Sequence, residues 1–272
     1  MSLAFPYAEL HAFPDGDAPH TGNPAGVMLL DRDLGDGDLL GMARSNNLSE
    51  TAYLRALDTD LWGLRWFTPG HEVDLCGHAT LASAVWLFEE GRVAGEEARF
   101  ETRSGRLTVR RTQGGLYEMN FPEVATRPAE PHDGVVAALG AAAPSKAFEV
   151  ERIHGSRFQM LVYANEADIA AMRPDFGALA ATGINVVATA PGARVHFVSR
   201  FFCPAAGIDE DPVTGSAHCA LAPYWAQRLG FAELNARQIG PRPGALSVRT
   251  GADGRVRLIG TAKRYLDGTI TL

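Results

Sequence analysis

One stretch of the chain predicts a helix that is apolar on nearly every side. Residues 78–89 read H-A-T-L-A-S-A-V-W-L-F-E and follow directly after Gly77. A helix with one apolar stripe packs on a surface, whereas a helix that is apolar all round is enclosed by other elements. The stretch therefore predicts a buried helix with the rest of a domain wrapped around it.

The surroundings of this helix recur about half a chain later. Residues 65–88 read R-W-F-T-P-G-H-E-V-D-L-C-G-H-A-T-L-A-S-A-V-W-L-F, and residues 200–225 read R-F-F-C-P-A-A-G-I-D-E-D-P-V-T-G-S-A-H-C-A-L-A-P-Y-W. Each contains an aromatic strand, a proline, an acidic loop, a glycine and an apolar helix. The second stretch has three more residues before its glycine, so the two align after a slip of three residues. Such an internal repeat predicts a duplication with two similar halves.

Most of the remaining segments predict strands, so the fold class that we expect is α+β. The pattern lacks the regular strand–helix alternation of a doubly wound fold. Residues 22–26 predict a tight loop, because glycine, asparagine and proline favour turns. Besides the two central helices, short helices are expected at 39–44, 135–139, 166–172 and 176–181. Strands are expected at 5–13, 27–30, 49–54, 61–67, 98–102, 107–112, 116–121, 158–162, 184–189, 195–202, 244–248, 256–259 and 264–272.

The expected domain boundary lies near the middle of the chain. Residues 124–134 are polar and rich in proline, which favours an inter-domain connection. We expect an N-terminal half over residues 1–123, joined by the C-terminal strand at 262–272, and a C-terminal half over residues 124–261. The active site is expected in the cleft between them.

Composition excludes several classes of function. A net charge of −7 and the lack of a basic run argue against nucleic-acid or membrane-surface binding. No stretch approaches the roughly 20 apolar residues of a membrane-spanning helix, and the N-terminus lacks the pattern of a signal peptide. The three cysteines show no CxxC spacing, so a reduced, cytoplasmic protein is expected.

Four strings, in order along the chain, resemble the PhzF family of phenazine-biosynthesis isomerase-like proteins. They are G-N-P-A-G-V (22–27), N-N-L-S-E-T-A-Y (46–53), F-T-P-G-H-E-V-D-L-C-G-H-A-T-L-A (67–82) and D-E-D-P-V-T-G-S-A-H (209–218). The resemblance implies the diaminopimelate epimerase-like fold, with two pseudo-symmetric domains that each roll a mixed β-sheet around a central buried helix. It also implies a homodimer, no cofactor, and isomerisation of a small carboxylic acid such as a dihydro-hydroxyanthranilate.

The resemblance also implies roles for individual residues. Glu50 matches the acid/base of the family, and His78 and Asp211 match its other polar active-site residues. The substrate-binding positions that it implies are Gly77, Gly215, Ser216 and Asn23.

The chemistry of these residues is consistent with proton transfer. A general base must reach a C–H proton and have a pKa near the working pH, which burial of a carboxylate favours. The first turn of a helix has free N–H groups and a partial positive charge, so helix starts at Gly77 and Gly215 predict a carboxylate-bearing substrate. Both glycines are also compatible with ordinary helix starts.

Several residues allow more than one interpretation. His78 either bonds the substrate and relays a proton or caps its own helix. Cys76 is a small buried hydrophobe or a reactive thiol. Two segments could be metal ligands, residues 209–211 and residues 71–74 together with His78, and Glu72 and Asp74 could instead be solvated loop charges. Neither segment has the spacing of a known metal motif, so no metal is expected.

Three functions therefore stay open at this stage. The first is a cofactor-independent isomerase that moves a proton, with a double-bond shift, on a small amino- or hydroxy-substituted acid. The second is an amino-acid racemase or epimerase of the same fold, although the second half offers Asp211 and Gly215-Ser216 where such enzymes need a second thiol, and Cys219 lies inside the helix. The third is a small-carboxylate binding protein without catalysis.

Overall fold

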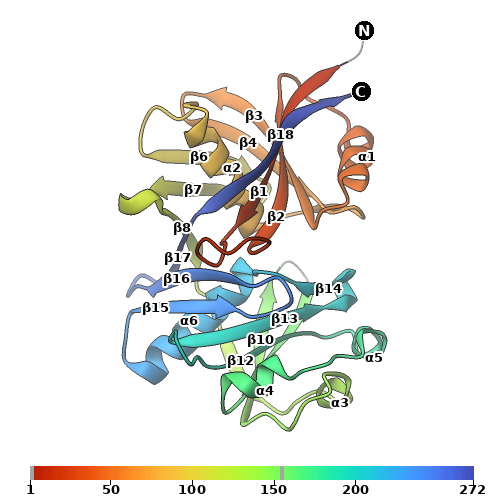
Figure 1. Ribbon diagram of the computed structural model, residues 1–272, viewed down its shortest axis with the longest axis vertical. Coiled ribbons are helices and arrows are strands. Elements are labelled where there is room, and N and C mark those ends of the chain that lie inside the picture. Colours follow the sequence, from red (N-terminus) through yellow and green to blue (C-terminus); the bar gives the residue numbers. More distant parts are fainter. Residues whose placement is uncertain (1–2, 154–155) are drawn as a thin grey trace. The chain divides into compact units, whose positions relative to one another are not determined.

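The computed structural model describes residues 3–153 and 156–272, and the chain forms two compact units (Figure 1). Unit 1 comprises Met1–Asp17, Thr21–Asn120 and Ile259–Leu272, and unit 2 comprises Ala18–His20 and Phe121–Leu258. The fold is α+β, with mixed sheets and few helices. None of the helices in these described ranges is both long and apolar enough to cross a bilayer.

Unit 1 is a mixed sheet around one central helix. Its strands pair in the order β18-β1-β2-β3-β4-β6-β7-β8, with the short β5 also on β4, and only the β2–β3 and β4–β6 pairs are parallel. The elements are β1 (Ala4–Ala12), β2 (Asn23–Leu30), α1 (Asp36–Asn46), β3 (Glu50–Asp58), β4 (Leu61–Phe67), β5 (Glu72–Val73), α2 (Gly77–Glu89), β6 (Glu97–Thr102), β7 (Gly105–Arg111), β8 (Tyr117–Pro122) and β18 (Ala262–Thr271).

Unit 2 repeats this plan. Its strands pair in the order β9-β10-β11-β12-β13-β15-β16, with the short β14 on β13. The parallel pairs, β11–β12 and β13–β15, are the third and fifth in this order, as β2–β3 and β4–β6 are in unit 1. The elements are β9 (Thr126–Ala129), α3 (Val135–Ala138), β10 (Lys146–Ile153), β11 (Ser156–Val162), α4 (Glu166–Ala170), α5 (Phe176–Ala181), β12 (Asn185–Pro191), β13 (Phe197–Cys203), β14 (Ile208–Asp211), α6 (Gly215–Leu229), β15 (Glu233–Gln238), β16 (Gly244–Thr250) and β17 (Arg255–Gly260).

The predicted central helices are confirmed. Every residue of α2 from His78 to Phe88 is buried, and α2 packs against β1, β2, β3, β7 and β18. In unit 2, α6 packs against β15 and β16 and ends at Gly230, whose φ of 77° is the left-handed conformation that glycine adopts without strain. Each fully buried Leu, Val or Phe of such a helix contributes roughly 1.5–3 kcal/mol.

The duplication extends to the strand registers. Thr51 pairs with Phe67 in unit 1 as Val186 pairs with Phe202 in unit 2. Phe67 then pairs with Glu72, and Phe202 pairs with Glu210. The slip of three residues in the sequence repeat therefore lies between these two positions, where unit 2 has the 3₁₀ turn Pro204–Ala206.

Two predictions about connections were wrong. Residues 23–26 belong to β2 and not to a tight loop; Pro24 sits at its second position, near the strand start where proline is tolerated. Within the polar stretch 124–134, Thr126–Ala129 forms β9, which pairs with β10. Strand β9 has no other partner strand within unit 2 among the described residues, and an edge strand accommodates Pro128.

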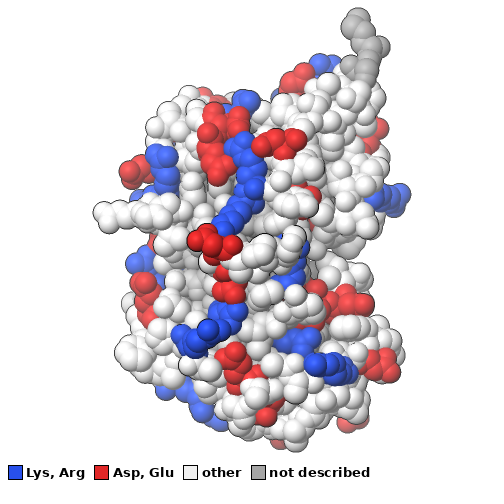
Figure 2. Space-filling model, viewed as in Figure 1, with Lys and Arg blue, Asp and Glu red and all other residues white. Residues whose placement is uncertain are grey.

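Charges are mixed over the face drawn in Figure 2, where acidic and basic side chains lie side by side. Ion pairs of the chain include Arg264 with Glu89 and Glu90, and Arg257 with Asp253. This face has no continuous basic patch of the kind that binds nucleic acid.

Candidate active site

Glu50 is the first residue of β3, and the chain reaches it through a tight reversal. Helix α1 ends at Asn46, and Asn47 adopts the left-handed conformation that asparagine tolerates, with a φ of 51°. The side-chain amide of Asn46 then donates to Thr51 Oγ1 at 3.1 Å. The side chain of Glu50 is only 13% exposed as a result.

The carboxylate of Glu50 faces the start of α2. Its Oε2 atom lies 3.2 Å from Nε2 of His78, and the His78 side chain is 6% exposed. The thiol of Cys76 also contacts this imidazole, with Sγ 3.5 Å from Nδ1 and 4.0 Å from Nε2. Unit 1 therefore brings a carboxylate, an imidazole and a thiol into one buried cluster, in which a proton can move between neighbouring groups.

The first turn of α2 beside this cluster has no acidic residue of its own. Cys76 is the N-cap residue but makes no side-chain capping bond, and the first turn contains no Asp or Glu. Instead, the Thr80 hydroxyl donates back to the Cys76 carbonyl at 2.6 Å. The backbone N–H groups of a helix N-terminus and the positive end of the helix dipole are suited to a carboxylate ligand.

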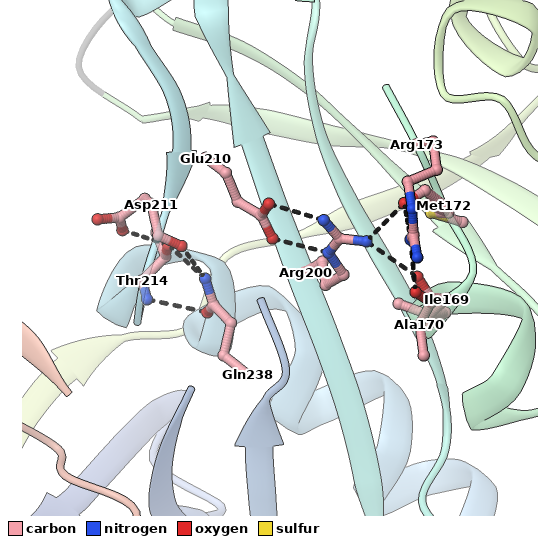
Figure 3. Close-up of polar contacts among 9 residues, drawn as sticks. All are labelled: Ile169, Ala170, Met172, Arg173, Arg200, Glu210, Asp211, Thr214 and Gln238. Atoms are coloured by element: carbon pink, nitrogen blue, oxygen red, sulfur yellow. Dashed lines mark hydrogen bonds and ion pairs between the residues drawn. The ribbon is translucent and has the colours of Figure 1, made fainter. Parts of the chain in front are cut away.

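The corresponding helix start in unit 2 is built from Asp211, Thr214 and Gln238 (Figure 3). The Thr214 hydroxyl donates to the Asp211 carboxylate. The backbone N–H of Thr214 donates to Gln238 Oε1 at 3.0 Å, and Gln238 Nε2 donates to the Asp211 carbonyl at 2.5 Å. Gly215 and Ser216 begin α6 next to this network, and its first turn also has no acidic residue.

Each unit fixes its acidic segment with an arginine from the preceding strand. Arg65 makes a two-pronged bond to Glu72 at 2.7 and 2.6 Å, and Arg200 does the same to Glu210 at 2.7 Å (Figure 3). Each guanidinium also lies over an aromatic ring, that of Phe67 or Phe202. The interpretation of Glu72 as a solvated charge was therefore wrong.

The ligands that could hold a metal ion in the described ranges are Glu50, Cys76 and His78, whose donor atoms all lie within 4.8 Å of one another. This is a different group from the acidic segments considered in the sequence. Glu210 is engaged by Arg200, which makes it a poor ligand. Three donors of oxygen, sulfur and nitrogen form an open set, and the same three groups are chemically competent for proton transfer without an ion.

The structure thus assembles the predicted residues in two sets. In unit 1, Glu50 and His78 contact each other beside the start of α2, whose first residue is Gly77. In unit 2, Asp211 lies next to the start of α6, whose first residues are Gly215 and Ser216. Asn23 is fully buried in β2, two residues before Ala25, the register partner of Glu50. Sequence reasoning missed Gln238, which no local motif marks, because its role depends on β15 lying beside β13.

A second buried histidine, His218, supports the start of α6. Its Nδ1 bonds the Thr214 carbonyl at 2.8 Å, in the place where Thr80 bonds Cys76 in unit 1. The side chain is fully buried, and this burial lowers the pKa of His218 from 6.5 to about 4.

We expect the protein to lose stability in mild acid because of His218. The unfolded chain takes up a proton near pH 6.5, whereas the folded pKa is about 4, so the contribution falls as the pH drops from 6.5 to 4. The loss between pH 7 and pH 5 amounts to about 2 kcal/mol. Urea unfolding of wild type and His218→Thr at both pH values measures it, because the variant copies Thr80 and cannot titrate. An equal pH dependence in both proteins would contradict the prediction.

Comparison with known proteins identifies relatives over nearly the whole chain. The family model PhzC-PhzF, phenazine biosynthesis-like protein, matches residues 10–268. An uncharacterized isomerase of Pseudomonas aeruginosa is 47% identical over 94% of this chain and 95% of its own length. The human phenazine biosynthesis-like domain-containing protein is 35% identical over 92% of this chain and 94% of its own length.

Solved structures agree with this picture. A PhzF family protein from Enterococcus faecalis superposes with a TM-score of 0.90 at 39% identity, covering 99% of this chain and 100% of that one. A hydroxyproline epimerase from Agrobacterium vitis, at 12% identity, superposes with a TM-score of 0.60 and covers 99% of this chain and 93% of that one. The second similarity concerns the fold alone, and it confirms the epimerase-like architecture.

Proposed function

We propose, from the premise that the chain belongs to the PhzC-PhzF family of phenazine biosynthesis-like proteins, that it is an isomerase that uses no cofactor. Its reaction would be proton transfer with an allylic double-bond shift on a small amino- or hydroxy-substituted carboxylic acid. An isomerase role is supported at the level of the family, since relatives from Pseudomonas aeruginosa are named uncharacterized isomerases. The substrate class and the mechanism are our proposal.

The observation that carries the proposal is the contact between Glu50 and His78. A buried carboxylate 3.2 Å from an imidazole, at a helix start that lacks an acidic residue, is well suited to a general acid/base. A purely structural pair in a core would not need the uncapped helix terminus beside it. This combination therefore supports chemistry on a carboxylate-bearing carbon acid.

In the proposed mechanism, the substrate carboxylate binds the free N–H groups at Gly77. Glu50 removes a proton from a carbon that is conjugated with this carboxylate, and the electron pair of the C–H bond delocalises into it. The helix terminus stabilises the negative charge as it develops. Glu50 then returns the proton to another carbon of the same molecule, so the double bond moves and no oxidation or reduction occurs. His78 orients the Glu50 carboxylate throughout.

Asp211, Gly215 and Ser216 of unit 2 are proposed to bind polar groups of the substrate. The expectation that Glu50 and Asp211 act on one substrate stays a prediction. Residues that act together in one reaction lose activity non-additively, so a double variant of Glu50→Gln and Asp211→Asn would be little slower than the slower single variant. Homodimer formation and a cytoplasmic location also stay predictions.

The decisive experiment is proton NMR in D₂O with a panel of small unsaturated and amino-substituted carboxylic acids. Loss or migration of a C–H signal in the presence of protein would support proton transfer and name the substrate class. Chemical shift changes without exchange or isomerisation, for every acid that binds, would instead favour a carboxylate-binding protein without catalysis.

Cys76 is the reason to keep racemisation as the second candidate, because its thiol contacts the imidazole of His78 at 3.5 Å. A two-thiol mechanism needs an opposing thiol, and the residue of unit 2 that corresponds to Cys76 as N-cap is Thr214. Cys219 is buried one turn further along, and burial raises the pKa of its thiol to about 12. These features favour the isomerase.

We therefore expect Cys76→Ser to keep most of the wild-type activity, within about threefold, since the thiol is not the base in the proposed mechanism. The rate of isomerisation and the rate of deuterium uptake at the α-carbon should be measured for both proteins. A loss of a hundredfold or more in Cys76→Ser would favour a thiol-dependent racemase.

A further inference from the structure

Asn185, the first residue of β12, is a buried polar side chain whose acceptor is not satisfied. The residue is 4% exposed, and its Oδ1 atom has no hydrogen-bond donor anywhere in the ranges 3–153 and 156–272. Leaving a buried acceptor unpaired is unfavourable, and native structures retain such groups where they have a task. Packing alone would be served better by an apolar residue of the same size.

The strand registers show what this position corresponds to. Val186 pairs with Phe202 as Thr51 pairs with Phe67, and so Asn185 occupies in unit 2 the place that Glu50 occupies in unit 1. The neighbouring strands agree, since Ala25 pairs with Glu50 in the parallel β2–β3 pair and Phe158 pairs with Asn185 in the parallel β11–β12 pair. Two register comparisons, one on each side of the strand, thus lead to the same equivalence.

The equivalence also gives the neighbourhood of the side chain. Glu50 reaches His78, the second residue of α2, and the second residue of α6 is Ser216. By the same arrangement, we expect the Asn185 side chain to lie toward the start of α6, which Asp211 and Gln238 fix. On this expectation the unsatisfied amide and the uncapped helix terminus form one half-site of unit 2.

An amide differs from a carboxylate in what it can do there. Asn185 carries no charge and exchanges no proton at neutral pH, so only the Glu50 side of the duplication supplies an acid/base. The free Oδ1 atom accepts a hydrogen bond, which requires a substrate group with a hydrogen to donate. An acid without such a group leaves the buried oxygen unsatisfied and is disfavoured.

We infer that Asn185 is the residue that selects the amino or hydroxyl substituent of the substrate, by accepting a hydrogen bond from it. The inference rests on the proposed function and adds the specificity determinant to it.

The test compares two acids that differ only in the donor, benzoate and anthranilate, by ligand-observed NMR titration. We expect wild type to bind anthranilate at least about fivefold more tightly than benzoate, and Asn185→Leu to lose this preference while still binding both. Asn235→Leu is the matched control, since Asn235 is an exposed residue of β15. The control should keep the wild-type preference.

A second measurement does not depend on the Asn185→Leu variant being folded. In wild-type protein labelled with ¹⁵N-asparagine, the side-chain amide signal of Asn185, identified by its absence in Asn185→Asp, should move with anthranilate and stay in place with benzoate. The inference is overturned if wild type shows no preference, if folded Asn185→Leu retains it, or if this signal responds equally to both acids. Binding is measured without turnover, so a failure of the isomerase proposal, seen as an absence of proton exchange, is distinguishable.

Discussion

Glu50→Gln is expected to lower kcat by about 10²–10⁴-fold, which is the contribution of a general acid/base. Glutamine keeps the shape of the side chain and can still accept a hydrogen bond from His78, which lies 3.2 Å away, but it cannot take up a proton. Binding of the carboxylate at the α2 start should change by no more than a few-fold, because the glutamate does not contact that group in the proposed mechanism. The loss should therefore fall on kcat and not on KM.

The matched control is Glu96→Gln, an identical substitution at an exposed position of the same unit. It should leave kcat unchanged. Isomerisation rates and deuterium incorporation would be measured for all three proteins with the acid that the D₂O panel identifies. Full activity in folded Glu50→Gln would exclude the acid/base role and leave carboxylate binding as the better account of the site.

The second large effect is expected on stability, from Arg200→Met. The side chains of Arg200 and Glu210 are 8% and 9% exposed, and Arg200 also donates to the carbonyls of Ile169 and Met172 (Figure 3). Removing the arginine leaves a buried carboxylate without its partner, which costs roughly 3–5 kcal/mol. Urea unfolding at pH 7 would measure this loss.

Two comparisons make the stability prediction specific. Arg65→Met breaks the equivalent pair in unit 1, but Arg65 is 32% exposed and Glu72 keeps a second partner in Arg103, so a loss of about 1 kcal/mol is expected. In the double variant with Arg200→Met and Glu210→Met, no buried charge remains, and a large part of the stability should return. Similar losses for Arg200→Met and Arg65→Met, or no recovery in the double variant, would contradict the argument.

Sequence reasoning succeeded where a local pattern reflects burial. The apolar run after Gly77 and its echo after Gly215 predicted both central helices, and the aromatic strands ending at Phe67 and near Phe202 lie where they were expected. The strands β10, β14 and β15 were not predicted. Strand β15 does alternate between exposed and buried residues, but its sequence E-L-N-A-R-Q contains no β-branched or aromatic residue to mark it.

The residues of the candidate site also differ in whether a local pattern in the sequence marks them. Motif resemblance named Glu50 and His78, and the structure adds that they touch. Asn185, Gln238 and the Arg200–Glu210 pair were beyond reach, because each depends on a partner that lies from 10 to 27 residues away or on a register shared by two sheets. Such tertiary relations leave no periodicity in the chain.

The closing of unit 1 by β18 has a consequence for biosynthesis. Strand β18 pairs with β1 from Ala4–Thr271 to Ala12–Ala262, and Leu3 and Leu272 exchange backbone hydrogen bonds. Unit 1 therefore cannot complete its sheet until β18 has been synthesised, and β18 follows nearly all of unit 2, which is one continuous segment, along the chain. During translation the β1 edge therefore stays unpaired on the β18 side while the whole of that segment is made.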